Sequence, residues 1–539
     1  MRDSYLAARV LDALLREDYG DISAQITRSR EGVGLTLSDG RLVRLAPGVP
    51  FQDFVVAPGQ LLGLEQVLDT LAEIAPEEDA DGVKAFFDEC VAALAALDSH
   101  DARLPDVLAR DPSYETLAAF ADHPGYPTAR ARPGVPDGEQ AAYAPEFGPA
   151  FELRWAVVPR RDLEPGSAEL PPDVLTWEPD EPRSEPSDEA HPPAALPAPH
   201  PSATPFPVHP DEVLFPVHPL AVDEVRRAGG RVLDEGRGTV RPVASMRAVE
   251  IGPRTHLVLP LPVSVLGTRD RLRIEPGRLG AGARAESLLR ELADDDVLVA
   301  GEQEYAGAGH DCLAWMVRRL PEGRRIPVTA LTQPHVEDGL RSAEVLGAYV
   351  RVLLRWGVRL LVEYGVVPEI RWHEVALVLD DHDADVCRPV TVPDEGADRG
   401  AEVRRRVKVL VQGHDGVLVS PARLAAAGVT VPELPEWMLT DDPHALTDAF
   451  VTRMLHLGTA AIVFALLPAA EAAALLRRTL EEALHPYGEL AMARLLRART
   501  LEAVRLTGRP WLTTGTLASE ARLEARPPRM SGPNYLRLT

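Results

Sequence analysis

The sequence predicts an α+β protein with a sheet in the middle of the chain and helices toward both ends. Apolar and polar residues alternate along 151–157, which is typical of a half-buried strand. Further strand-like segments occur between residues 240 and 272. From residue 342 onward helical spacing dominates, and the last hundred residues are almost wholly of this kind.

Residues 1–160 are expected to form one mixed unit. A helix comes first, because leucine and valine recur at helical spacing among charged residues. A hairpin follows, pairing 32–37 with 41–45 across a Ser-Asp-Gly turn. Two helices are then expected at 61–74 and 82–97.

The rest of the chain divides into three expected regions. Residues 161–205 are rich in Pro and Glu, lack periodicity, and are expected to form a linker or an insertion. Residues 206–340 hold the strand-like pieces RPVASMRAVE, THLVLPLPVSVLG and RDRLRI. Residues 341–539 are mostly helical, with short strands at 375–379 and 407–412.

Composition excludes several classes of protein. A chain of 539 residues with 45% hydrophobic residues is expected to hold two or three packed units. Its net charge of −25 argues against nucleic acid or a membrane as a partner, because such partners require a dense basic face. The longest apolar run, 457–470, is too short to span a bilayer and favours a buried helix.

Three widely spaced cysteines fit neither a disulfide framework nor a CxxC metal site. The N-terminus does not resemble a signal peptide, because charges interrupt its apolar residues. A reducing, cytoplasmic location is therefore expected.

The segment Asp122–Val158 carries the strongest functional signal. It begins with a His-Pro pair and continues with Arg130 and Arg132, a glycine turn, an aromatic and acidic block, and a strand. Rigid prolines, permanently charged arginines and a supporting sheet are typical components of an anion-binding site.

The segment RPVASMRAVE is expected to be a strand with Ser245 and Arg247 on one face. A hydroxyl beside a guanidinium suits phosphate, because it combines a rotatable donor with a forked, charged one. From these residues alone, a surface strand with one salt-bridged arginine is the simpler interpretation.

A third candidate lies in LLVEYGVVPEIRWHEVALVLDD. If this stretch is extended, alternation places Glu369, Arg371 and His373 on one side. Three ionisable groups on one face, flanked by apolar elements, indicate either a functional site or a solvated edge.

Other patterns argue for no site. Four His-Pro pairs at His191, His200, His209 and His218 are nine residues apart, and an extended Pro-rich backbone holds such histidines too far apart for one metal ion. GLGAGARA lacks the buried strand that a dinucleotide-binding loop follows. No GxxxxGK[ST] or GxSxG motif is present.

Taken in order, these segments resemble the NRPS-independent siderophore synthetases, the aerobactin-synthetase-like ligases, from about residue 60 to 500. DHPGYPTARARPG resembles their HPxHPxxKxRxG pattern, with Tyr126 at the second His and Arg130 at the Lys. YAPEFG and ELRWAVVPR are similar to the blocks that follow. FPVHPLAVDEV resembles PVHPWQ around His218, and RPVASMRAV resembles TSSxRT, keeping Ser245 and Arg247.

Two later segments extend the resemblance. THLVLPLPVSVLGTR resembles the family's KLSL…ITxxxR stretch, with Arg269 at the arginine. GVVPEIRWHEVALVL has the length of G-I-x-x-E-x-H-x-Q-N-x-L-L-x-L and keeps Glu369, while Arg371, His373 and Glu374 replace the His, Gln and Asn. Asp394 is the candidate for an aspartate that follows in the family.

The resemblance implies a cupped-hand fold with a mixed thumb, mostly antiparallel fingers and a helical palm, usually as a homodimer. It also implies an ATP- and Mg²⁺-dependent ligase that adenylates a carboxylate of citrate or a similar acid and lets an amine or alcohol displace AMP. Its expected partners are therefore small-molecule substrates.

The resemblance also assigns roles to individual residues. Phosphates would be held by Arg130, Arg132, Ser245 and Arg247, with Arg269, His373 and Glu374 in the same nucleotide site, and Mg²⁺ by Glu369 and Asp394. His218 would line the pocket, and the expected catalytic residues are Arg247, His218, Arg371 and His373.

Two interpretations follow from the departures at Arg371, His373 and Glu374. A carboxylate in place of an amide removes two donors and adds a negative charge near phosphate, which weakens binding unless a metal or Arg371 compensates. The chain is then either a divergent ligase with a rearranged pocket or a catalytically impaired relative that serves as a binding or scaffold partner.

Overall fold

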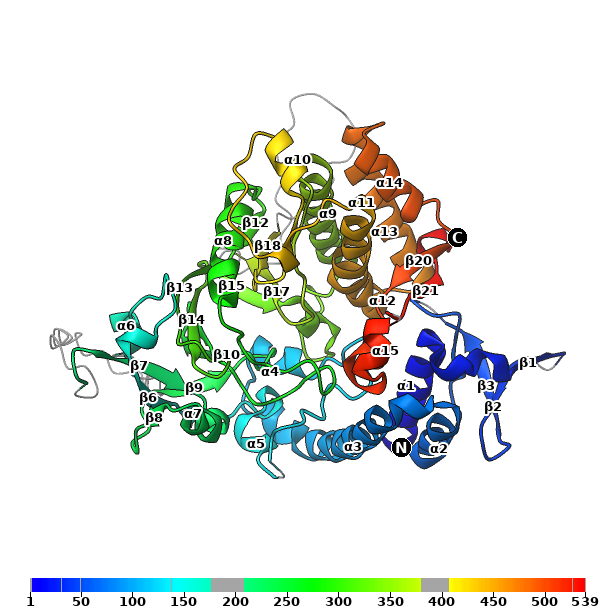
Figure 1. Ribbon diagram of the computed structural model, residues 1–539. Helices are drawn as coiled ribbons and strands as arrows, with labels where there is room; N and C mark the ends of the chain where they lie inside the picture. Colours follow the sequence, from blue (N-terminus) through cyan, green and yellow to red (C-terminus); the bar gives the residue numbers. More distant parts are fainter. Residues whose placement is uncertain are drawn as a thin grey trace, which may run out of the picture.

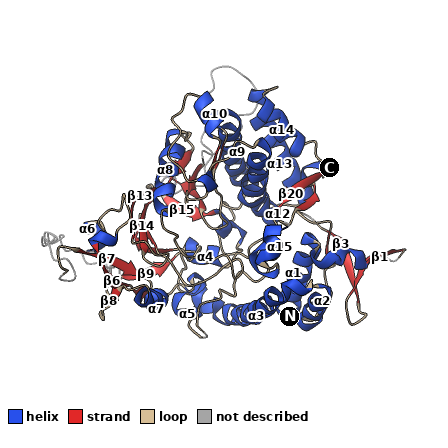
Figure 2. Cartoon of the chain, viewed as in Figure 1, coloured by secondary structure: helices blue, strands red, loops and turns tan. Residues whose placement is uncertain are grey.

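We describe the protein from a computed structural model, which covers residues 2–30, 32–48, 50–136, 138–175, 208–379, 407–525 and 527–538. Figure 1 shows the N-terminal part along the bottom and right, the central sheet at the left, and the C-terminal helices at the top. The predicted α+β class is confirmed: Figure 2 shows most of the labelled strands at the left and the C-terminal helices above and to the right of them. His191, His200, Cys387 and Asp394 lie outside the described residues.

The N-terminal part combines helices with a small antiparallel sheet. Its elements are α1 (Arg2–Glu17), β1 (Ile26–Ser29), β2 (Gly32–Thr36), β3 (Leu42–Pro47), β4 (Phe54–Val56), α2 (Leu64–Ile74) and α3 (Ala80–Leu108). The predicted hairpin is confirmed, because β2 and β3 are antiparallel and Val33 pairs with Leu45. Helix α3 extends well beyond the predicted end at residue 97.

The central sheet has six strands in the order β13-β14-β11-β10-β9-β5, and every pairing in it is antiparallel. These are β5 (Phe151–Glu152), β9 (Thr239–Pro242), β10 (Ala248–Gly252), β11 (Thr255–Val258), β13 (Gly301–Gly307) and β14 (Ala314–Arg319). A three-stranded sheet lies beside it, formed by β6 (Arg154–Pro159), β7 (Glu212–Val217) and β8 (Arg231–Val232). The two sheets share one apolar cluster that contains Trp155, Phe215 and Trp315.

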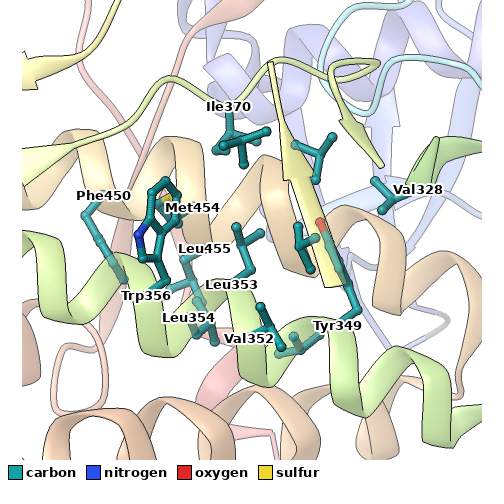
Figure 3. Packing of buried hydrophobic residues seen from close by; sticks show 14 of the residues in the cluster. Val328, Tyr349, Val352, Leu353, Leu354, Trp356, Ile370, Phe450, Met454 and Leu455 are labelled. Atoms are coloured by element: carbon teal, nitrogen blue, oxygen red, sulfur yellow. The ribbon is translucent and has the colours of Figure 1, made fainter. Parts of the chain in front are cut away.

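A second four-stranded sheet carries the loops that matter most for the site. Its order is β12-β18-β17-β15, with β12 (Val297–Val299) parallel to β18 (Lys408–Val411) and with β15 (Arg324–Pro327) and β17 (Val375–Leu379) antiparallel. Helix α9 (Ala343–Arg359) packs against it and begins at Ser342, whose Oγ accepts a hydrogen bond from the N–H of Val345. Figure 3 shows Tyr349, Leu353 and Trp356 of α9 packed with Phe450 and Met454 of a neighbouring helix.

The remaining elements are mostly short. The helices are α4 (Tyr114–Ala119), α5 (Gln140–Tyr143), α6 (Pro172–Leu175), α7 (Val222–Arg227), α8 (Arg278–Glu291), α10 (Pro421–Ala426), α11 (Pro443–Ala449), α12 (Ala461–Leu466), α13 (Ala469–Leu484), α14 (Ala491–Arg499) and α15 (Glu520–Ala525). The strands are β16 (Val366–Val367), β19 (Leu418–Val419), β20 (Arg505–Gly508) and β21 (Met530–Pro533).

One stretch, Pro443–Leu466, is long and apolar enough to cross a membrane by length and composition alone. It comprises α11, a π-helical middle (Phe450–Ala460) and α12, and 61% of its most apolar window is buried inside the structure. This burial is that of a core helix, as the sequence predicted for the apolar run 457–470, which overlaps the end of this stretch.

The two ends of the described chain share a core. Leu512 and Leu517 belong to the same apolar cluster as the buried residues of α1, α2 and α3. The carboxylate of Glu17 accepts hydrogen bonds from the N–H groups of Leu512 and Thr513, at 2.8 and 2.7 Å. The N-terminal part is therefore completed by residues from the far end of the sequence.

Candidate functional site

Ser245 and Arg247 lie in a tight turn between β9 and β10, so the prediction of a single strand through them is wrong. Val249 pairs with Pro242 across the two antiparallel strands, and the N–H of Met246 donates to the carbonyl of Val243 at 2.9 Å. Met246 has φ 57°, a left-handed conformation uncommon for a non-glycine residue. The alternating pattern of apolar and polar residues does not reveal such a turn, because the same residues are compatible with a continuous strand.

The turn presents one unsatisfied hydroxyl at the end of the β9–β10 hairpin. The Oγ of Ser245 is buried and has no hydrogen-bond partner among the described residues. The N–H of Ala244 donates to Oε2 of Glu115 at 2.9 Å, which fixes the position of the turn. Because a buried hydroxyl without a partner costs free energy, this Oγ is a candidate ligand contact.

Arg371 lies at the centre of a cluster of carboxylates. The π-helical segment Leu360–Tyr364 ends at Gly365, which has φ 66°, and the chain then enters the loop that carries Glu369 and Arg371. Nη2 of Arg371 lies 3.0 Å from Oε2 of Glu369 and 2.6 Å from Oδ1 of Asp415, and Nη1 lies 3.1 Å from Oε2 of Glu374.

His373 is separated from this cluster, although alternation had placed it on the same side as Arg371. Its Nδ1 lies 3.2 Å from Oγ1 of Thr329. Burial lowers the pKa of His373 to about 4, and the charges of Glu146, Arg132 and Glu374 also act on it. At neutral pH it is therefore a neutral imidazole between the Arg132–Glu146 pair and Glu374.

The sequence Gln412-Gly413-His414-Asp415-Gly416, directly after β18, forms the facing loop, and the sequence analysis did not identify it. Gly413 has φ 72°, and its N–H donates to Oε1 of Glu302 at 3.0 Å. A Cβ on Gly416 would lie 1.6 Å from Oε2 of Glu369, so only glycine allows this approach. Two glycines around an aspartate after an apolar strand are the signal that could have indicated this loop.

Arg318 extends the network into the interior. Its side chain is only 3% exposed, and its Nε lies 2.6 Å from Oε1 of Glu302 while Nη2 lies 3.5 Å from Oε1 of Glu374. Although burial favours the neutral acids, nearby arginines hold the pKa values of Glu302, Glu374 and Asp415 below their usual range. The carboxylates are thus ionised and each is held by a guanidinium.

Two arginines at the rim of the network are paired only loosely. Nη2 of Arg247 lies 3.8 Å and Nη1 of Arg278 lies 3.5 Å from the same Oδ2 of Asp415. Their side chains are 18% and 30% exposed, and Arg278 also pairs with the exposed Glu275. Arg278 extends over the ring of Trp437, at 5.7 Å from the ring centroid. These guanidinium groups remain accessible to an incoming anion.

Arg130 and Arg132 are both held by carboxylates. Nε of Arg130 lies 2.8 Å from Oδ1 of Asp122, and Arg132 donates to Glu146. Although burial opposes ionisation, Arg132 and His100 lower the pKa of Glu146 to about 2. Nη1 of Arg132 is buried and has no hydrogen-bond partner among the described residues, so this arginine retains a free donor.

Two predicted residues have contacts of another kind. His218 is buried between the rings of Tyr143 and Phe151, and its Nδ1 accepts a hydrogen bond from the N–H of Leu220 at 3.1 Å. Arg269 donates to the main-chain carbonyls of Thr514, at 3.3 Å, and Ala518. The described contacts do not connect either residue to Arg371.

Two arginines from the C-terminal half lie near the network. Nη1 of Arg453 donates to the carbonyl of Gly416 at 2.7 Å. Burial lowers the pKa of Arg453, Glu369 opposes that shift, and the positive charges of Arg509 and Arg371 add to it. Arg509 stacks on Trp511 at 4.0 Å, beside a small cavity that Pro124 and Gly125 also line.

The chain thus combines a β-rich centre, a mostly helical C-terminal half and a network of arginines and carboxylates. The model of the IucA / IucC family matches residues 113–333. This match bears out the family resemblance that the motifs predicted. No curated protein sequence matches the chain.

Solved structures share the fold over nearly the whole chain. They include the petrobactin biosynthesis protein AsbB from Bacillus anthracis str. Sterne, with TM-score 0.70, 14% identity, and coverage of 99% of this chain and 96% of that one. ATP-bound aerobactin synthetase IucA from a hypervirulent pathotype of Klebsiella pneumoniae has TM-score 0.68, 17% identity, and coverage of 98% and 99%. Aerobactin synthetase IucC from the same pathotype has TM-score 0.65, 15% identity, and coverage of 99% and 98%.

Proposed function

We propose that this chain is an ATP-dependent ligase that joins a carboxylate of a citrate-like polycarboxylic acid to an amine or alcohol, releasing AMP and pyrophosphate. The observation that carries the proposal is the turn at Ser245 and Arg247. Its buried Ser245 hydroxyl has no hydrogen-bond partner among the described residues, and its Arg247 guanidinium is paired weakly, with Nη2 3.8 Å from Oδ2 of Asp415. The ATP-bound state of a structure with this fold supports the choice of nucleotide.

The phosphates of ATP would contact the rim arginines. A phosphate oxygen is a stronger acceptor for Arg247 and Arg278 than a carboxylate at 3.5 Å or more, and the Oγ of Ser245 could donate to the same anion. Arg132, with its free Nη1, is a further donor from the N-terminal part. A nucleotide would therefore draw on segments that are distant in sequence.

The acid substrate would occupy the side of Arg453 and Arg509. Each of these arginines lacks a carboxylate partner among the described residues, and they lie within electrostatic range of one another. Two uncompensated guanidinium groups fit a substrate with more than one carboxylate. An acid bound there would lie between them and the phosphate-binding turn.

The reaction follows from these positions. A carboxylate oxygen of the acid attacks the α-phosphorus of ATP, and the bond to the pyrophosphate oxygen breaks. The amine nitrogen or alcohol oxygen then attacks the activated carbonyl carbon, the bond to AMP breaks, and the nucleophile loses a proton. Arg247 and Arg278 would stabilise the negative charge that develops on phosphate. His373, being neutral, would contribute a hydrogen bond rather than a charge.

Mg²⁺ does not fit the described residues around Glu369. This carboxylate and its neighbours Glu374 and Asp415 are all bound to Arg371. Within the described ranges, the one group of three ligand atoms spaced for a metal ion is His310, Asp311 and Cys312, which is elsewhere. Asp394, the second predicted ligand, lies outside those ranges. No step of the proposed mechanism is therefore assigned to a metal ion held by the described residues.

The experiment incubates the full chain with ATP, a panel of dicarboxylic and tricarboxylic acids, and hydroxylamine, with and without Mg²⁺. A ligase releases pyrophosphate and forms a hydroxamate. At ATP concentrations near the wild-type KM, the Arg247→Ala variant should give much weaker signals, whereas Arg161→Ala, at a side chain 84% exposed, should keep them. If no acid supports turnover and ATP does not raise the melting temperature, the chain is a binding or scaffold relative instead.

We also infer a cytoplasmic homodimer that acts on small molecules. Cys90 and Cys312 are buried free thiols, which fits a reducing compartment. The homodimer comes from the family resemblance, and light scattering of the purified chain tests it directly.

A further inference from the structure

Arg371 has the position of a cation shared by three carboxylates. Its Nη2 alone lies within 3.0 Å of both Glu369 and Asp415, so one charged atom bridges two acids from separate loops. Its Nη1 adds Glu374 at 3.1 Å. Three oxygen ligands around one cation would be typical of a divalent ion, but here the cation is a side chain of the protein.

The carboxylates around Arg371 are too widely spaced to share one small ion. Among the described residues, only His310, Asp311 and Cys312 bring three ligand atoms within 4.8 Å of one another, whereas two oxygens bound to one Mg²⁺ at about 2.0–2.1 Å lie at most about 4.2 Å apart. The loops are built for the larger group, because Gly413 and Gly416 leave room for Glu374 and Glu369 with no side chain between. A Cβ on Gly413 would lie 2.4 Å from Glu374 and 2.7 Å from Nη1 of Arg371.

Charge in the network is already balanced. Apart from the exposed Glu275, which pairs with Arg278, its ion pairs among the described residues join four carboxylates (Glu302, Glu369, Glu374 and Asp415) with four arginines (Arg247, Arg278, Arg318 and Arg371). A divalent ion added here would leave two positive charges uncompensated in a largely buried region, which is costly. An anion at the rim would instead replace Asp415 as the partner of Arg247 and Arg278.

We propose that Arg371 is a fixed internal cation that takes the place of a divalent metal ion, so that this site binds its polyanion without a protein-held metal. The part of this inference that concerns the polyanion rests on the proposed function, whereas the part that concerns the cation does not. The two parts are therefore tested separately.

The first experiment measures Mn²⁺ binding to the full chain by electron paramagnetic resonance, without nucleotide. The wild-type chain and Arg371→Lys, which keeps a positive charge, should show no binding that depends on Glu369. Arg371→Gln removes the charge and should bind Mn²⁺ at least 10-fold more tightly than the wild type. The double variant Arg371→Gln with Glu369→Gln should lose that gain.

Several results would overturn the internal-cation proposal. One is a Mn²⁺ site in the wild-type chain that disappears in Glu369→Gln. Another is a folded Arg371→Gln variant with no gain in binding. If Arg371→Gln unfolds because its carboxylates repel one another, Mn²⁺ should restore the folded state, and failure to do so counts against the proposal.

The second experiment measures ATP binding by calorimetry in EDTA and in Mg²⁺. The wild-type affinity should differ by less than 3-fold between the two conditions, whereas Arg371→Gln should bind at least 10-fold more weakly in EDTA than in Mg²⁺. A wild-type chain that binds ATP only with Mg²⁺ contradicts the proposal. A wild-type chain that binds no ATP in either condition defeats the proposed function, and the Mn²⁺ result still decides the role of Arg371.

Discussion

Nη2 of Arg371 lies 2.6 Å from Oδ1 of Asp415, a residue 44 positions further along the chain. This contact joins the loop before β17 to the loop after β18, two adjacent antiparallel strands. The antiparallel pairing brings the two loops to the same edge of the sheet, and the contact fixes their relative position. The following predictions depend on this arrangement and on the arginines around it.

The Arg247→Ala variant should raise the KM for ATP by about 10- to 100-fold, because a charge-assisted hydrogen bond to phosphate contributes about 1.5–3 kcal/mol. Arg247→Lys should recover only part of the loss, since an ammonium group lacks the fork that engages two oxygens. Steady-state kinetics of pyrophosphate release provides the measurement. An unchanged KM in Arg247→Ala would place the phosphates elsewhere.

The Arg318→Met variant should lower the free energy of unfolding by about 3–5 kcal/mol, because it leaves Glu302 and Glu374 buried without their guanidinium partner. Arg254→Met is the matched control. Arg254 forms a pair of similar length, 2.6 Å, with Glu322, but both side chains are exposed, so a change within about 0.5 kcal/mol is expected. Urea unfolding of both variants measures the two changes in the free energy of unfolding. Equal losses of stability in the two variants would contradict the prediction.

The Gly416→Ala variant should displace the carboxylate of Glu369 and weaken the hold on Arg371, because the new Cβ would meet Oε2. A loss of about 1–3 kcal/mol in stability is expected, together with weaker ATP binding. Gly347→Ala in α9 is the control: its Cβ would have an ordinary contact at 3.8 Å and should stabilise the helix by about 0.5–1 kcal/mol. Melting temperatures that fall equally in both variants would show that Glu369 is not the cause.

Glu115 should contribute a loss of stability between about pH 4.5 and 7. Burial raises the pKa of this carboxyl from 4.5 to about 7, so the folded state retains a proton that the unfolded chain has already lost. Stability therefore decreases as the pH rises through this window, by up to about 3 kcal/mol from this group. Glu115→Gln should remove that part of the decrease, which chemical unfolding at pH 4.5 and 7.5 would measure.

Local sequence patterns predicted the order and type of most elements. The hairpin of β2 and β3 follows from a turn signal between alternating residues, and α9 follows from helical spacing. The turn at Met246 was not predictable in this way, because only its pairing with neighbouring strands reveals the positive φ. Local pattern determines local structure well where tertiary contacts agree with it.

The sequence predicted which residues belong to the candidate site, but it did not predict which of them contact one another. Ser245, Arg247, Glu369 and Arg371 were identified from spacing and resemblance, and their placement around Asp415 was not. Asp415 and Arg318 belong to segments without a motif, and their partners are supplied by strand pairing over long sequence separations. These partners depend on the order of the strands in the sheet, and a single sequence does not reveal that order.

The shared core of the two chain ends has a consequence for synthesis. Glu89 accepts hydrogen bonds from Tyr126 and Thr128 at 2.6 and 2.9 Å, and from Thr516 at 2.7 Å. While the ribosome still holds residue 516, the N-terminal part lacks this donor and the apolar contacts of Leu512 and Leu517. Its core is therefore complete only after the last part of the chain has been translated.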